Sequence, residues 1–146
     1  MAIVDMLPQP GGSSAETLTL LWENDSPTSD FANKSYALSD TMSNYRRVRI
    51  AYQPSKTLTA EEKQGVIDLP VEYITRFNSS GNMPMASLFA TDNGSTKTYY
   101  ARGVYVPTAS LESLDALYFL PCYKGNNSST SAFNAWCIPL KIYGIN

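Results

Sequence analysis

The chain has 146 residues, a net charge of −2, a sequence pI of about 5.0 and no histidine. A chain of this length fits one domain and can bury most of its apolar surface in one core. The charge excludes a broad basic surface for nucleic acid. The missing imidazole excludes Ser-His-Asp catalysis, Cys-His catalysis and histidine metal ligands. Charged residues make up only 16% of the chain, and its ten tyrosines favour β-structure.

The first 15 residues are predicted to form an arm or linker that leads into one domain spanning residues 16–146. Residues 1–14 contain two prolines, two glycines and two serines, which are typical of irregular chain. They lack the basic start and long apolar run of a signal peptide, and no apolar run approaches the roughly 20 residues that span a bilayer. We therefore expect synthesis in a cytoplasm and no membrane association.

Strand patterns begin directly after the arm. Residues 16–22 (ETLTLLW) alternate leucine with threonine and then become apolar on both faces at Leu21 and Trp22. Residues 35–39 (SYALS) form a short second run. Between these runs the pattern predicts a turn from Asn24 to Pro27.

The clearest alternation lies at residues 46–53 (RRVRIAYQ), which predict a strand with one apolar and one polar face. Val48, Ile50 and Tyr52 share the apolar face. The neighbouring arginines are interpreted as a solvated strand face rather than a nucleic-acid patch.

Proline divides the next segment. Residues 63–77 (KQGVIDLPVEYITRF) contain two β-type runs separated by Pro70, which cannot donate to a strand ladder. Residues 57–64 (TLTAEEKQ) carry a weak helix-start pattern and predict at most one short helical turn.

Four further runs are separated by Asn-, Gly- and Ser-rich turn signals: residues 84–90, 97–106, 116–123 and 135–145. Roughly eight to ten short strands with no βαβ rhythm predict an all-β, antiparallel, jelly-roll-like β-sandwich.

Two groups of side chains could carry chemistry: the two cysteines and a pair of carboxylates. Cys122 and Cys137 are expected to be free and buried, because synthesis in a cytoplasm disfavours a disulfide. Asp68 and Glu72 would lie about 13 Å apart in an extended strand and flank Pro70, so we interpret them as surface carboxylates rather than as a glycosidase pair. The sequence therefore predicts no enzyme activity, no catalytic residue, no cofactor and no metal site.

Aromatic side chains and polar loops remain as binding candidates. Tyrosine and tryptophan can stack on sugar rings or anchor protein interfaces, although alternation directs about half of them into the core. Loops on a rigid β-scaffold commonly carry recognition. The candidate binding residues are Asp92, Asn93, Tyr99, Tyr123, Asn126, Asn127 and Phe133.

Two segments resemble β-domains of structural proteins from phages that infect Gram-positive gut bacteria. The first segment carries Leu21, Trp22, Ser26, Pro27, Phe31, Ala32, Leu38, Ser39, Tyr45, Val48 and Ile50. The second is the C-terminal run IPLKIYGIN, residues 138–146. Together they bracket residues 17–146, and the middle of the chain carries no such motif. The residues expected to form this structural signature are Trp22, Pro27, Phe31, Tyr45 and Tyr143.

The resemblance implies a virion protein of the tail-fibre or receptor-binding type, made in the host cytoplasm and attaching to the host surface by multivalent weak binding. The implied partners are other virion proteins, through the N-terminal arm, and a host cell-surface glycan. A homo-oligomer is expected, most simply a trimer. Two alternatives stay open: a capsid-decoration or head-fibre protein, and a non-catalytic carbohydrate-binding module.

Overall fold

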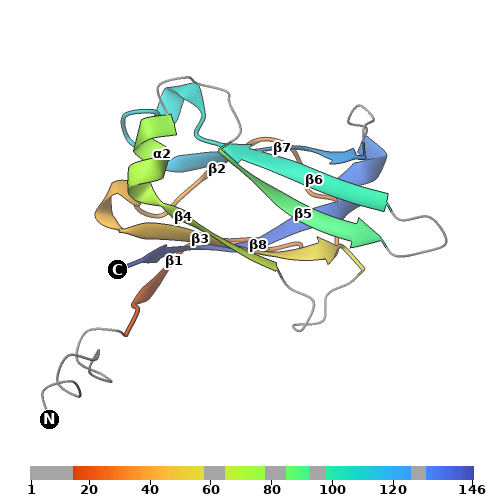
Figure 1. The fold of residues 1–146 in the computed structure, drawn as a ribbon, viewed down its shortest axis with the longest axis horizontal. Helices are drawn as coiled ribbons and strands as arrows, with labels where there is room; N and C mark the ends of the chain where they lie inside the picture. Colours follow the sequence, from red (N-terminus) through yellow and green to blue (C-terminus); the bar gives the residue numbers. More distant parts are fainter. Residues whose placement is uncertain (1–14, 58–64, 78–84, 93–97, 126–130) are drawn as a thin grey trace, which may run out of the picture.

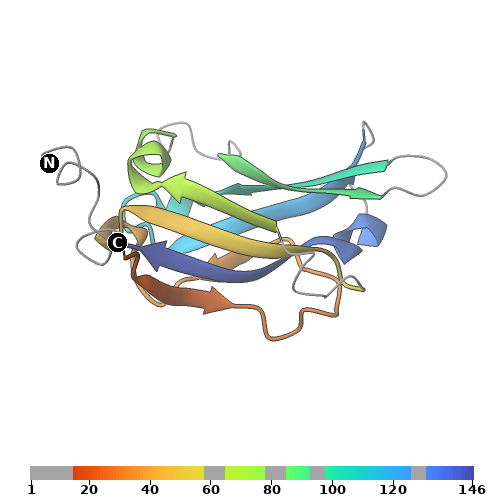
Figure 2. The same cartoon turned by 60° about the horizontal axis from the view of Figure 1, so that its bottom comes forward.

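The computed structural model describes residues 15–57, 65–77, 85–92, 98–125 and 131–146. In this part of the chain, eight strands form two four-stranded antiparallel sheets that face each other (Figures 1 and 2). The first sheet has the order β1 (Leu18–Glu23), β8 (Trp136–Ile145), β3 (Arg47–Ser55) and β4 (Gly65–Pro70). The second has the order β2 (Ser35–Ala37), β7 (Ala116–Lys124), β6 (Thr98–Tyr105) and β5 (Ala86–Asp92). The predicted all-β sandwich is confirmed.

Strands near the start of the chain pair with strands near its end. The first strand pairs with the last and the second with the seventh, which is the jelly-roll-like feature of the fold. The four middle strands pair instead as neighbours in sequence, β3 with β4 and β5 with β6. The first sheet therefore combines two long-range pairings, β1 with β8 and β8 with β3, with one local pairing. The second sheet combines one long-range pairing, β2 with β7, with two local pairings.

The alternation predicted for β3 is confirmed. Val48 and Ile50 are fully buried and Tyr52 is 8% exposed, whereas Arg47 and Arg49 lie on the outer face of the sheet. This arrangement follows from the two-residue period of a strand, which directs successive side chains to opposite faces.

The edge strand β1 departs from simple alternation. A β-bulge lies between Leu20 and Trp22, and it leaves Leu21 as the buried residue at 2% exposure. Leu18 and Leu20 are each 44% exposed. A bulge adds one residue to one strand and re-aims the side chains that follow. The residue that enters the core is therefore the one at the bulge.

The prediction of a second β-run after Pro70 is wrong. Residues Val71–Phe77 form the helix α2, in which Val71 and Ile74 are buried and Glu72 and Tyr73 are exposed. Buried positions three residues apart fit one face of a helix, and the preceding proline ends β4 because it lacks a backbone donor. The β-branched residues of this segment favour a strand locally, which is why the sequence predicted one. Burial of Ile74 on one face of a helix outweighs this weak preference.

The described residues contain more helical turns than the single one expected. Three short 3₁₀ helices accompany α2: Met42–Asn44, Thr108–Ser110 and Ser131–Ala135. The helical turn predicted within residues 57–64 lies almost wholly outside the described residues, as does the N-terminal arm.

An arginine lies in the core between the sheets. Arg102 is fully buried, and its guanidinium donates to the carbonyl oxygens of Cys137 at 2.9 Å, Leu120 at 2.8 Å, Trp136 at 3.0 Å and Asn134 at 3.3 Å. Desolvation lowers the pKa of Arg102 from its ordinary value. Because Arg102 belongs to β6 and two of its acceptors to β8, the side chain links the two sheets.

Both cysteines are free and fully buried, as predicted. A hydrogen bond between the thiols lowers the pKa of Cys122 and, together with burial, raises the pKa of Cys137. Cys122 lies directly opposite Arg102 in the β6–β7 pair. The two thiols therefore belong to the same buried region as the guanidinium.

Candidate binding surfaces

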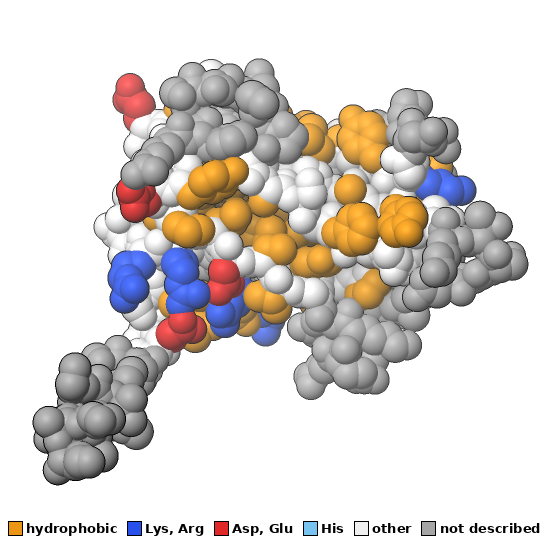
Figure 3. Space-filling model, viewed as in Figure 1, with side chains coloured by type: hydrophobic (Ala, Val, Ile, Leu, Met, Phe, Trp, Pro, Cys, Tyr) orange, Lys and Arg blue, Asp and Glu red, His pale blue; other side chains and the backbone are white. Residues whose placement is uncertain are grey.

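Three exposed aromatic side chains gather on the outer face of the second sheet. Phe89 of β5 is 51% exposed, Tyr99 of β6 is 50% exposed and Tyr123 of β7 is 38% exposed. We call these three residues the aromatic strip. Hydrophobic side chains along β5 and β6 are visible on this part of the surface (Figure 3). Large apolar side chains that remain in water in a cluster commonly mark an interaction site.

Strand register explains why the strip is continuous. Ala101 lies directly opposite both Phe89 and Tyr123, so a small residue separates the two larger ones across three strands. Tyr99 is two residues from Ala101 and therefore occupies the diagonal position on the same face. The Phe89 and Tyr99 ring centroids are 5.9 Å apart with the rings tilted by 30°. The result is a shallow apolar surface rather than a cleft.

The strip lies at the end of the sheet where two of the predicted loops begin. β5 ends at Asp92, β6 begins at Thr98, and the amide of Gly125 donates to the carbonyl oxygen of Tyr99 at 2.7 Å. The side chain of Asp92 and the predicted residues Asn93, Asn126 and Asn127 lie outside what the structure describes. Their predicted role in binding stays a prediction.

Phe133 does not join the strip. It lies in the 3₁₀ helix Ser131–Ala135, half-buried, with its ring 6.3 Å from that of the inward-facing Tyr100. The ammonium group of Lys124 lies 5.6 Å from the centre of the Phe133 ring. The structure thus brings Tyr99 and Tyr123 together and places Phe133 against the core.

Phe89 was missed as a candidate. Its neighbours Leu88 and Ala90 are 0% and 6% exposed, so alternation directs Phe89 outward. Alternation in the run SLFA shows that every second residue faces solvent. It does not show which set of residues does so, because that depends on how the sheet packs.

A second tyrosine pair lies farther along the same outer face. Tyr105 and Tyr118 are cross-strand partners whose rings stack at 4.9 Å. The hydroxyl of Tyr118 donates to the carbonyl oxygen of Asn33 at 3.4 Å. Burial raises the pKa of Tyr105. Since both rings are half-buried against each other, this pair offers less exposed surface than the strip.

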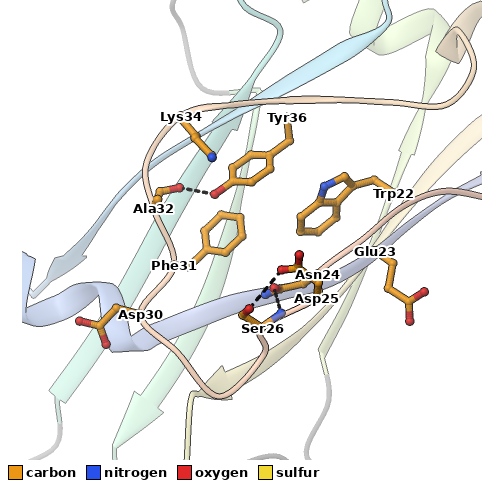
Figure 4. A pocket seen from close by; sticks show the side chains of 10 residues that line it. All are labelled: Trp22, Glu23, Asn24, Asp25, Ser26, Asp30, Phe31, Ala32, Lys34 and Tyr36. Carbon is orange, nitrogen blue, oxygen red and sulfur yellow. Dashed lines mark hydrogen bonds between the residues drawn. The ribbon is translucent and has the colours of Figure 1, made fainter.

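The signature residues of the first segment form a compact aromatic cluster at one edge of the sandwich. The ring of Trp22 packs edge-to-face against the rings of Phe31 and Tyr36, with centroid distances of 6.0 and 5.1 Å. The ring of Phe31 packs edge-to-face on that of Phe119, with the centroids 5.4 Å apart. Phe31 is 5% exposed. The cluster therefore closes the core between the two edge strands β1 and β2 (Figure 4).

The chain between Trp22 and Tyr36 forms a loop with a pocket of about 320 Å³ beside this cluster (Figure 4). Asn24 organises the turn: its side-chain oxygen accepts from the amide of Ser26 at 2.8 Å. The carbonyl oxygen of Pro27 accepts from the side-chain amide of Gln53 at 2.6 Å. The backbone turn itself runs from Ser26 to Ser29, whose amide donates to the carbonyl oxygen of Ser26 at 3.1 Å, so it lies two residues after the predicted turn from Asn24 to Pro27.

Tyr45 and Tyr143, the other signature residues, occupy different environments. The ring of Tyr45 lies so close to Gly144 that an added Cβ there would sit 2.4 Å from a ring carbon. The Tyr45 hydroxyl donates to Asp40 at 2.8 Å, which raises the pKa of Tyr45 and lowers that of Asp40. Tyr143 lies between Leu20 and Arg49 in the register of the first sheet.

The predicted surface carboxylates lie on the first sheet and on α2. Asp68 accepts hydrogen bonds from Arg47 at 2.8 Å and from Arg49 at 2.7 Å, and Glu16 pairs with the same arginines. The hydrogen bond from Arg49 lowers the pKa of Asp68. Glu72 is exposed in the first turn of α2. The arginine cluster of β3 is therefore matched by carboxylates of this chain.

Neither a metal-binding group nor a membrane-spanning helix is present in the described residues. Among them, no three His, Cys, Asp or Glu side chains are grouped so that they could hold a metal ion. No helix in the described ranges is long and apolar enough to cross a bilayer. The sequence matches no protein-family model and has no significant match among curated proteins.

Proposed function

We propose that the protein is a bacteriophage virion structural protein of the tail-fibre or receptor-binding type, in which the β-sandwich attaches to the host surface by weak multivalent contacts. Two observations support the proposal. One is the resemblance of the Leu21–Ile50 segment and the C-terminal run to phage structural domains. The other, which carries the attachment role, is the aromatic strip.

The aromatic strip suits a glycan because its three rings are exposed, close together and mounted on paired strands. The faces of tyrosine and phenylalanine rings are apolar, and they match the apolar C–H faces of sugar rings. Paired strands hold the rings in place, so little side-chain freedom is lost on binding. A shallow strip also contacts a ligand weakly, which is the regime in which many copies on one particle raise avidity.

Binding to host cells tests the attachment role. Fluorescently labelled protein is expected to bind Gram-positive gut bacteria and their purified wall polysaccharides. Tyr99→Ala and Tyr123→Ala should each weaken binding by about tenfold, because each removes one stacked ring. The matched control is Tyr73→Ala, since Tyr73 is 40% exposed but lies on α2, at the opposite end of the sandwich (Figure 1).

Equal binding by all three variants would reject the strip as the attachment surface. If the wild-type protein binds neither cells nor polysaccharides, the attachment role fails. Mass spectrometry of particles purified from a lysate of the host tests the virion assignment by itself. Detection with capsid stoichiometry would favour the decoration alternative, and absence from particles would reject a virion role.

A further inference from the structure

We infer that the pocket enclosed by residues 22–36 is a second ligand site, separate from the aromatic strip, that takes one neutral saccharide unit. The inference is independent of the proposed function, because a pocket of this kind would remain in a decoration protein or in a carbohydrate-binding module. It depends on the walls of the pocket, the charge around it, its hydrogen-bonding groups and its anchoring.

One wall of the pocket is aromatic. Trp22 and Tyr36 line it and are only half-buried, so part of each ring remains accessible. The ring of Phe31 stacks on that of Tyr36, with the ring centroids 4.8 Å apart and the ring planes 20° from parallel. The rings support one another in this way and face the polar side chains of Asn24 and Asp25 (Figure 4). An apolar wall opposite polar groups is the arrangement that a sugar ring requires.

The charges around the pocket are balanced. The carboxylate of Asp30 lies 2.7 Å from the ammonium group of Lys56, and the carboxylate of Glu23 lies 3.8 Å from that of Lys141. Asp25 and Lys34 are the remaining charged residues of the lining, and they carry opposite signs. Among the lining residues and their ion-pair partners neither sign predominates, which favours a neutral ligand.

A cationic ligand is disfavoured for a second reason. The ammonium group of Lys34 already lies 5.3 Å from the centre of the Tyr36 ring. A ligand cation would therefore meet like charge at the aromatic face that would otherwise attract it.

The polar groups of the pocket match hydroxyls, which both donate and accept. The Asp25 carboxylate accepts one hydrogen bond, from the Ser26 hydroxyl at 3.1 Å. A carboxylate has about four acceptor positions and an ammonium group has three donors. Asp25 can thus accept from a ligand hydroxyl and Lys34 can donate to one. Hydrogen bonds to charged groups are the stronger kind, which gives these two residues most of the expected selectivity.

The loop is held in place before any ligand arrives. The backbone amide of Asn24 donates to Leu140 and its side chain donates to Pro139, each at 2.8 Å. The amide of Phe31 donates to Asn134 at 3.0 Å. These acceptors belong to β8 and to the 3₁₀ helix before it, so the loop is tied to the sandwich at both ends. Such anchoring reduces the entropy that binding would otherwise lose.

The volume of about 320 Å³ lies at the lower end of the ~300–1,000 Å³ that is usual for ligand pockets, which suits one ring rather than a chain. Both the size and the chemistry therefore point to a single neutral monosaccharide unit, free or at the end of a glycan.

Tryptophan fluorescence provides a direct test, because the chain has two tryptophans. Trp136 stacks on Tyr100 at 4.0 Å, away from the pocket, and Trp136→Phe keeps a ring there while leaving Trp22 as the single reporter. This single-tryptophan protein is titrated with glucose, galactose, rhamnose and N-acetylglucosamine. A saturable change in Trp22 emission is expected with at least one of them.

Matched aspartate variants locate the site. Asp25→Ala should weaken binding by about tenfold through loss of a charged hydrogen-bond acceptor. Asp115→Ala is the control, since Asp115 also accepts from a nearby serine hydroxyl, Ser113, but lies outside the pocket. Tyr99→Ala should leave the titration unchanged, which separates the pocket from the aromatic strip.

Four results would overturn the inference. One is the absence of a saturable change with any of the four sugars. Another is equal binding by the Asp25→Ala and Asp115→Ala proteins. The third is an Asp25-dependent response to ethanolamine that is stronger than the response to every sugar, which would make the pocket a cation site. A loss of sugar binding in Tyr99→Ala alone would assign the signal to the aromatic strip and would also contradict the proposal.

Discussion

At the scale of single residues, Arg102 is the least expected feature of the core. An arginine is rarely fully buried without a carboxylate, and here backbone carbonyl oxygens from β7, β8 and the preceding 3₁₀ helix surround the guanidinium. Cys137 has a left-handed backbone (φ 51°), and both its carbonyl and that of Trp136 accept from Arg102. In the described residues, no buried side-chain nitrogen or oxygen lacks a partner.

Replacing Arg102 should therefore destabilise the fold. Arg102→Leu leaves several buried carbonyl groups without donors, so we expect the free energy of unfolding to fall by about 3–5 kcal/mol. Arg102→Lys should recover little, since an ammonium group lacks the five donors of the planar guanidinium. Urea denaturation followed by fluorescence measures both changes.

Arg46→Leu serves as the control for this experiment. Arg46 is exposed, and its replacement should shift the free energy of unfolding by no more than about 0.5 kcal/mol. Similar stabilities for Arg102→Leu and Arg46→Leu would show that the buried guanidinium contributes nothing to the link between the sheets.

At the scale of elements, the C-terminal strand β8 is central to the first sheet, and its glycine sets how closely another element can approach. β8 pairs with both β1 and β3. The ring of Tyr45, which precedes β3, covers the backbone at Gly144, where a Cβ would come within 2.4–2.6 Å of three ring atoms. This contact gives a physical reason for the glycine in the C-terminal run: the Tyr45 ring shields a strand glycine.

The variant Gly144→Ala tests this contact. The added methyl group must displace the Tyr45 ring and disturb its hydrogen bond to Asp40, so we expect a loss of about 1–3 kcal/mol in the free energy of unfolding. In a Tyr45→Ala background the same substitution should cost much less, because the ring is gone. Thermal or urea unfolding of the four proteins in this double-mutant cycle provides the measurement. Additive effects would mean that ring and glycine do not interact.

At the scale of the whole molecule, the exposed apolar side chains lie on both outer faces of the sandwich. The aromatic strip is on the second sheet, while Leu18 and Leu20 are exposed on the edge strand β1 of the first. The proposed homo-oligomer would remove part of this surface from water, which is the usual source of stability in symmetric assemblies.

We expect the full chain of 146 residues to form a trimer of its 16.1 kDa subunit in light-scattering measurements. Leu20→Ser should shift the equilibrium towards the monomer if β1 contributes to the contact, whereas Thr19→Ser at the neighbouring position should not. A strict monomer at every concentration tested would contradict the proposed assembly.

Local patterns were sufficient for much of the fold. The period of two in residues 46–53 predicted β3 and its buried face, and the Asn- and Gly-rich segments predicted the strand ends. The expectation of synthesis in a cytoplasm predicted free, buried cysteines. Val71–Phe77 was the clear failure, because its β-branched residues suit a strand locally and only the burial of Ile74 shows the helical face.

The sequence by itself determined the all-β class, most of the strand positions and the aromatic and polar residue types available for binding, since these follow from periodicity and turn chemistry. Only the tertiary structure decided which residues meet. Strand register placed Phe89 beside Tyr99 and Tyr123, packing turned Phe133 towards the core, and the anchoring of residues 22–36 on β8 created a pocket in a stretch whose sequence predicted only a turn. The physical reason is that register and long-range contacts depend on the packing of two sheets, which no local pattern encodes.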